Sequence, residues 1–117
     1  MTTRLFNSAD FLQPTDKEPV RSIITQSKDQ VIIAWHLKSE QEIPAHIHPN
    51  GQDTWTILAG KGLYYLDASG ATQIISAGDV VVAHTGEVHG VINNGDEPLI
   101  FISVVSPVDA GYQLAKS

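Results

Sequence analysis

Short alternating segments separated by tight turns are the feature that most constrains the fold of this chain. Runs rich in Val, Ile and Thr are followed at short intervals by Gly, Asn or Asp, as in Ala59-Gly60-Lys61-Gly62 and Asn94-Gly95-Asp96. These turn residues tolerate positive φ, and no segment carries a convincing helical stripe of apolar residues. The pattern is typical of an all-β sandwich or barrel.

Nine segments have the composition expected for strands: 20–27, 30–37, 43–48, 53–58, 62–67, 72–76, 80–84, 88–93 and 99–105. With 117 residues, the chain is long enough for one domain that buries about two-thirds of its unfolded surface. We therefore expect a single domain over residues 1–117, in which residues 1–19 form an N-terminal arm or an edge segment.

Charge and composition exclude several classes of function. The net charge is −6 with only seven Lys and Arg residues, which are scattered, so a nucleic-acid partner is not expected. The chain has no Cys, so a metal would be held by His, carboxylate or amide groups. The start lacks the basic and apolar stretches of a signal peptide and no run approaches a membrane span, so we expect a cytoplasmic protein without a membrane partner.

The sequence His46-Ile47-His48 places two imidazoles on one face of an extended segment. Successive side chains of a strand alternate between faces, so His46 and His48 point the same way while Ile47 points to the other side. Pro44 and Pro49 favour extended geometry in the residues before them, which makes a helix here unfavourable. The two imidazoles are therefore able to share one metal ion.

Asp53 and His89 extend this pair to a full ligand set. Asp53 follows a tight turn, and an antiparallel strand would bring its carboxylate back beside the two histidines. Taken singly, each residue has an ordinary explanation, since histidines also serve as half-buried polar groups and Asp often accepts backbone hydrogen bonds in turns. Three imidazoles and a carboxylate together are ligands suited to Fe, Mn, Ni, Zn or Cu.

Two spaced motifs resemble those of the cupin superfamily. The first is His46-x-His48-x4-Asp53-x6-Gly60, and the second is Gly78-x5-His84-x-Gly86-x2-His89-x3-Asn93. Together with their spacer they cover residues 46–93, and the strand-like segments on either side extend the resemblance to nearly the whole chain. The resemblance implies a small single-domain cupin with the double-stranded β-helix, or jelly-roll, fold.

The chain departs from the family pattern at three positions. Asp53 stands where the family usually has Glu, so this shorter side chain coordinates directly or through water, or else neighbouring Gln52 takes its place. Glu40 stands where the first motif often begins with Gly, in a surface turn. His84 stands at a position usually held by Pro, either as a turn residue or as an additional ligand or proton carrier.

On such a barrel, His46, His48, Asp53 and His89 would line one interior face and bind a divalent transition metal. Because side chains alternate along a strand, Trp55 and Ile57 share the face of Asp53, and Val91 shares that of His89. These three apolar side chains predict a substrate pocket beside the metal ligands. The alternative is that these side chains simply fill the barrel core. One of Tyr64 and Tyr65 should face inward.

Other polar residues near the motifs have less defined roles. Glu87 and His84 are the candidates for proton transfer, together with a tyrosine. We interpret Asn93 as an amide that stabilises the following turn, and His36 as a surface or cap residue.

Three hypotheses for function remain open. The resemblance implies a metal-dependent enzyme with dioxygenase-like or isomerase-like chemistry on a small organic molecule. A non-catalytic protein that binds a small ligand or senses metal would use the same pocket, and a barrel whose ion only supports folding is the third alternative. Small cupins commonly pair, and the apolar positions in Arg4-Leu5-Phe6 and Phe11-Leu12 would cross to a partner in a homodimer, cover an edge, or fold back on their own barrel.

Overall fold

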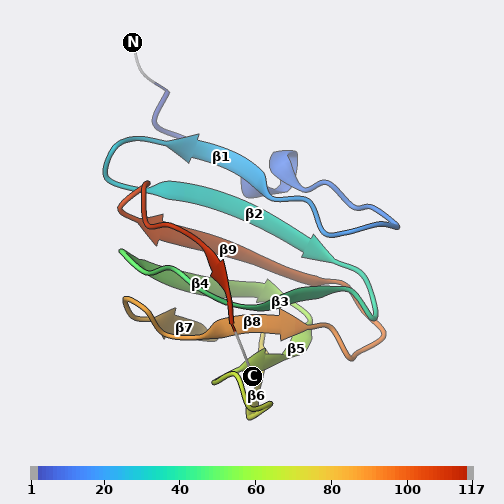
Figure 1. Ribbon diagram of the computed structural model, residues 1–117. Helices are drawn as coiled ribbons and strands as arrows, with labels where there is room; N and C mark the ends of the chain where they lie inside the picture. The colour runs from blue at the N-terminus through green and yellow to red at the C-terminus, as the bar shows by residue number, and fades with distance from the viewer. Residues whose placement is uncertain (1–2, 116–117) are drawn as a thin grey trace.

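Two five-stranded antiparallel sheets form the structure, a computed structural model that describes residues 3–115 (Figure 1). The first sheet has the order β1 (Ser22–Gln26), β2 (Val31–Leu37), β9 (Leu99–Ser106), β4 (Gln52–Ala59) and β7 (Val80–Ala83). The second has the order β10 (Gln113–Leu114), β3 (Glu42–Ile47), β8 (His89–Ile92), β5 (Lys61–Tyr65) and β6 (Thr72–Ser76). The chain passes repeatedly between the sheets, so the predicted all-β, single-domain, double-stranded β-helix is confirmed.

The nine expected strands are all present, with ends that differ from the prediction by at most two residues. His48 was expected inside a strand, but β3 ends at Ile47 and His48 lies just beyond it. Strand β10 and a short 3₁₀ helix, η1 (Ser8–Phe11), were not anticipated. Both are too short to leave a periodic pattern in the sequence.

Strand β9 shows how the sequence pattern builds the core. Its residues alternate strictly, so Leu99, Phe101, Ser103 and Val105 are buried between the sheets. The main hydrophobic cluster joins Leu99 and Phe101 to further buried side chains, namely Leu37, Ile43, Trp55, Ile57, Tyr64, Ile75 and Val91. Because this cluster fills much of the interior, polar groups on the inner faces need hydrogen-bond partners or a ligand.

The N-terminal arm lies against the edge strand β1 (Figure 1). The Ser22 hydroxyl donates to the Phe11 carbonyl, and the rings of Phe6 and Phe11 meet edge to face with centroids 6.1 Å apart. The described part of the arm therefore folds back on its own sheet, while the homodimer stays a prediction. No helix in residues 3–115 is long and apolar enough to cross a membrane.

The turn between β2 and β3 places Glu40 in left-handed backbone conformation, with φ of 73°. Its backbone N–H donates to the Asn93 carbonyl at 2.8 Å, which fixes the turn. The Asn93 amide donates in turn to the carbonyls of Leu37 and Glu97 and accepts from Gly95 N–H, as expected of a turn-stabilising side chain. A residue with a Cβ is strained at this φ, and Gly is not.

Replacing Glu40 by Gly should therefore stabilise the protein. We expect Glu40→Gly to be more stable than Glu40→Ala by about 1 kcal/mol in urea unfolding, because both variants lose the carboxylate but Ala keeps the Cβ. Equal free energies of unfolding for the two variants would contradict the strain at this turn.

Candidate metal centre

Strands β3 and β8 bring two of the histidines face to face. His46 on β3 is the direct cross-strand partner of His89 on β8, and their ring centroids are 4.2 Å apart. The pairing register shifts between Ile43 and His46. Close approach depends on Gly90, because a Cβ there would lie 2.7 Å from the Ile43 carbonyl oxygen.

Asp53 reaches the same point from β4 in the opposite sheet. Its Oδ2 lies 3.0 Å from His89 Nε2 and 3.4 Å from His48 Nε2. One ligand atom from each of His46, His48, Asp53 and His89 lies within 4.8 Å of all the others. Residues separated by as many as 43 positions therefore converge on one point between the sheets.

Each imidazole is oriented by a hydrogen bond from its Nδ1 to a backbone carbonyl. The acceptors are Pro44 for His46 at 2.8 Å, Gly111 for His48 at 2.7 Å and Glu87 for His89 at 3.1 Å. A carbonyl only accepts, so each neutral ring carries its proton on Nδ1. The Nε2 atoms keep free electron pairs, which is the tautomer that metal ligation requires.

The chemistry of these atoms fits a bound cation. With both protons on Nδ1, the Nε2 atoms of His48 and His89 turn electron pairs toward the Asp53 carboxylate, so a positive charge among them, either a metal ion or an added proton, is favoured. For metal–ligand bonds of about 2.1 Å, neighbouring ligand atoms lie about 3.0 Å apart in octahedral geometry and about 3.4 Å apart in tetrahedral geometry. The two separations from Asp53 agree with these values.

The ionisation of the site follows from burial and from its hydrogen bonds. Burial and the neighbouring His89 lower the pKa of His46 to about 4. Burial opposes charge on His48 as well, but hydrogen bonds to Asp53 and to the Gly111 carbonyl raise its pKa above the ordinary value. Burial would raise the pKa of Asp53, yet hydrogen bonds from His48 and His89, donated when a ring carries a proton on Nε2, and from the Ser103 hydroxyl hold it well below its usual range.

Ser103 supports the carboxylate from β9. Its hydroxyl donates to Asp53 Oδ1 at 2.5 Å, and both side chains are buried. This bond leaves Oδ2 facing the imidazoles and fixes the carboxylate orientation. Partners of this kind tune metal affinity through the geometry of the ligand they hold.

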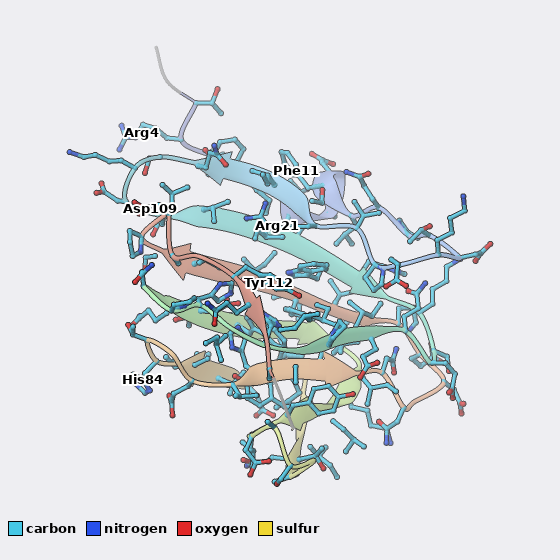
Figure 2. All side chains as sticks on the ribbon, in the orientation of Figure 1. Arg4, Phe11, Arg21, His84, Asp109 and Tyr112 are labelled. Carbon is cyan, nitrogen blue, oxygen red and sulfur yellow. The ribbon has the colours of Figure 1, made fainter. Side chains whose placement is uncertain are left out.

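A cavity of about 590 Å³ adjoins the four-residue group. Trp55 lies between the cavity and the core, since its ring stacks on Phe101 at 4.3 Å and meets His89 at 5.9 Å. Further lining is largely apolar and includes Ile33, Trp35, Val105, Val108 and Ala110. Tyr112 and Arg21, both labelled in Figure 2, also line the cavity.

The structure separates the predicted site residues into three groups. His46, His48, Asp53 and His89 come together, whereas Gln52 lies on the opposite face of β4 and is exposed. Of the predicted pocket residues, Trp55 lines the cavity. Ile57 and Val91 are a correction, because both pack in the hydrophobic core, beyond Trp55, and lie outside the cavity wall.

The residues considered for proton transfer lie outside this cavity. His84 and Glu87 are exposed and pair with each other at 2.8 Å, and Figure 2 shows His84 near the end of β7. Of the two tyrosines, Tyr64 faces inward, buried edge to face against Trp55. Tyr65 donates to Glu42, and half-buried His36 lies outside the cavity lining.

Four contributors to the site were missed by sequence reasoning. Ser103 had a usable signal, because it is a polar residue at an inward position of an otherwise apolar strand. Arg21, Tyr112 and the Gly111 carbonyl carry no such signal. The Tyr112 ring lies 5.0 Å from that of His46, although the two residues are far apart in the sequence.

Removing the Ser103 hydroxyl should weaken metal binding. We expect Ser103→Ala to lower the affinity for Zn²⁺ about tenfold, measured by chelator competition, because Asp53 loses a buried hydrogen bond and its fixed orientation. Ser106→Ala, on the outward face of the same strand, is the matched control and should leave the affinity unchanged. Equal affinities for the two variants would rule out this supporting role.

Metal affinity should fall as the pH is lowered. The raised pKa of His48 means that a proton competes with the metal already above the ordinary histidine pKa, whereas His46 stays neutral until about pH 4. Each proton displaced costs about tenfold in affinity per pH unit below the ligand pKa. We expect chelator competition from about pH 8 to about pH 5 to show this decline, and a constant affinity over that range would contradict the ligand set.

Comparison with known proteins agrees with the fold and the motifs. The cupin domain family matches residues 34–105. An uncharacterized conserved protein with a double-stranded β-helix domain from Klebsiella pneumoniae is 41% identical, with a TM-score of 0.94 over 99% of this chain and 100% of that one. The polyketide cyclase RemF from Streptomyces resistomycificus is similar in fold, with a TM-score of 0.80, 17% identity, and coverage of 100% of this chain and 87% of that one.

A plant protein also matches in sequence. Germin-like protein 5-1 from Oryza sativa is 32% identical over 76 residues, which are 61% of this chain and 33% of that protein. The chain therefore spans about one-third of the length of that curated relative. Because the family match covers more than half of its residues, the chain belongs to the cupin domain family.

Proposed function

We propose that this protein holds one divalent transition metal on His46, His48, Asp53 and His89 and acts on a small organic molecule in the adjoining cavity. The observation that carries the proposal is the common tautomer of the three imidazoles. Every Nδ1 is bound to a backbone carbonyl, so all three Nε2 atoms are available as ligands beside one carboxylate.

The ligand set and the cavity together favour chemistry over a purely structural ion. Four protein ligands leave one or two positions of a five- or six-coordinate ion for water, dioxygen or an organic ligand. The cavity reaches His46, His48 and Asp53, so such a ligand has a path to the ion. When bound, Fe, Mn, Ni, Zn or Cu would supply Lewis acidity, or redox chemistry where the metal allows it, consistent with an oxygenase or isomerase.

The protein's own residues then bind and orient the organic molecule. Trp35 and Trp55 provide flat apolar surface, while Val105 and Val108 close the cavity beside them. A bound organic molecule would displace water from the space next to the ligand atoms, which would strengthen electrostatic interactions there.

A non-catalytic ligand-binding or metal-sensing role is the second candidate. It is favoured by the position of His84 and Glu87, which pair on the surface outside the cavity lining. The cavity contains Tyr112 beside His46 and two glutamates, and none of these forms a hydrogen bond with a metal-ligand side chain in residues 3–115. A protein that only binds needs no such proton-transfer group.

Metal analysis of the purified protein tests the centre itself. We expect near-stoichiometric metal in the wild-type protein, its loss in His48→Ala, and its retention in His84→Ala, because His84 lies outside the group. Elemental analysis after metal loading and desalting provides the measurement. Equal metal content in all three proteins, or none in the wild type, would contradict the proposal.

Azide binding to the Co²⁺-loaded protein tests whether the ion is accessible. Azide that enters an open coordination position changes the visible absorption of Co²⁺, whereas a closed structural site gives no change. We expect a saturable change with the wild-type protein. A spectrum that does not respond would leave a metal site without the proposed function.

A further inference from the structure

The metal-site cavity contains one cationic Lys or Arg side chain among its described lining residues, that of Arg21. This residue directly precedes β1, and its side chain is exposed at the cavity. Because the chain has a net charge of −6, cationic side chains are scarce, and one beside the candidate metal ligands is notable.

Arg21 has no protein partner within residues 3–115. The ion pairs in this part of the chain join Lys38 to Asp16 or involve histidines, and no side-chain hydrogen bond of Arg21 is present. The other charged lining residues are Glu18, Glu42 and Asp53. Glu42 accepts from the Tyr65 hydroxyl, and Asp53 is engaged by Ser103 and the imidazoles, so these two carboxylates are already occupied.

One further lining residue, Trp55, contains a donor without a partner in the described part of the chain, but this donor lies below the cavity surface. Trp55 is 2% exposed, and its indole Nε1 is buried without a hydrogen-bond partner in the described residues. A cation without a protein partner among residues 3–115, in a largely apolar cavity, favours a ligand with an anionic group at one end and an apolar body elsewhere.

We propose that the cavity binds a small carboxylic acid with an apolar, ring-sized body, and that Arg21 binds its carboxylate. The planar guanidinium offers two parallel N–H donors, which match a carboxylate and distinguish it from a neutral amide. The apolar walls formed by Ile33, Trp35 and Val105 bind the body of the acid. This inference rests on the proposed function, because the same cavity leads to the metal ligands.

The test compares phenylacetate with phenylacetamide, two probes of similar shape that differ in charge. Affinities for the Zn²⁺-loaded protein are measured by calorimetry for the wild type, Arg21→Gln, Arg21→Lys and Arg4→Gln. We expect the wild type to prefer phenylacetate at least about tenfold, Arg21→Gln to lose this preference, and Arg21→Lys to keep part of it. Arg4→Gln makes the same charge change on the N-terminal arm, away from the cavity, and should keep the preference (Figure 2).

Several outcomes would overturn the assignment of Arg21. These are binding of neither probe, equal affinity of the wild type for both, an equal loss in Arg4→Gln, or an unchanged preference in Arg21→Gln. If Arg21→Gln keeps the preference for phenylacetate, the measurement is repeated on the metal-free protein. A preference that disappears without the metal would mean that the metal binds the carboxylate, and the proposed function would stand. Zinc content, measured on every variant, separates these results from failure of the metal site, in which the wild-type protein itself binds no zinc.

Discussion

The hydrogen bonds from three imidazole Nδ1 atoms to backbone carbonyls are the interactions on which the site depends. Each neutral ring has two possible tautomers, and these bonds select the one with the proton on Nδ1. As a result, all three Nε2 atoms present their electron pairs to the same position. The carbonyls of Pro44 and Glu87 lie two residues before the histidines they orient, so local chain geometry supplies these contacts. The third, from Gly111, is made by a distant segment and depends on the complete fold.

The carboxylate of Asp53 completes this arrangement because the two sheets pack closely at the site. A side chain one methylene shorter than Glu still places Oδ2 within 3.4 Å of two imidazole nitrogens. Asp also has one fewer rotatable bond, so less conformational entropy is lost when it is fixed. Ser103 occupies the second oxygen, which leaves a single carboxylate oxygen directed at the metal position.

Local alternation explains what the sequence could predict. It placed the side chains of His46 and His48 on one side of an extended segment, although β3 ends at Ile47, and it assigned the nine main strands, because both depend on neighbouring residues. The choice between Asp53 and Gln52, which the sequence left open, follows from the structure, since β4 begins at Gln52 and turns the two side chains to opposite faces. Alternation predicts which face of the sheet a side chain lies on, but not how far along the barrel it lies. For this reason Ile57 and Val91 were assigned to the pocket, whereas both lie in the core.

Contacts between distant segments explain what the sequence could not predict. The bond between His48 and Gly111 spans 63 positions, and that between Ser103 and Asp53 spans 50. Neither partner carries a motif for the contact, and Tyr112 follows the last of the strands that alternation reveals. Such contacts are specified by how the strands pack, and this packing is encoded by the whole core.

The C-terminal segment joins the metal ligands to the cavity wall. After β9 the chain crosses to the second sheet, where Gln113 and Leu114 of β10 pair with Ile47 and His46 (Figure 1). On the way, the Ala110 carbonyl accepts from Asn50 N–H at 2.8 Å and the Gly111 carbonyl orients His48. Ala110, Gly111 and Tyr112 also line the cavity. A ligand that displaces this segment would therefore disturb the orientation of His48, so the shape of the cavity and the affinity for metal are coupled through the same few residues.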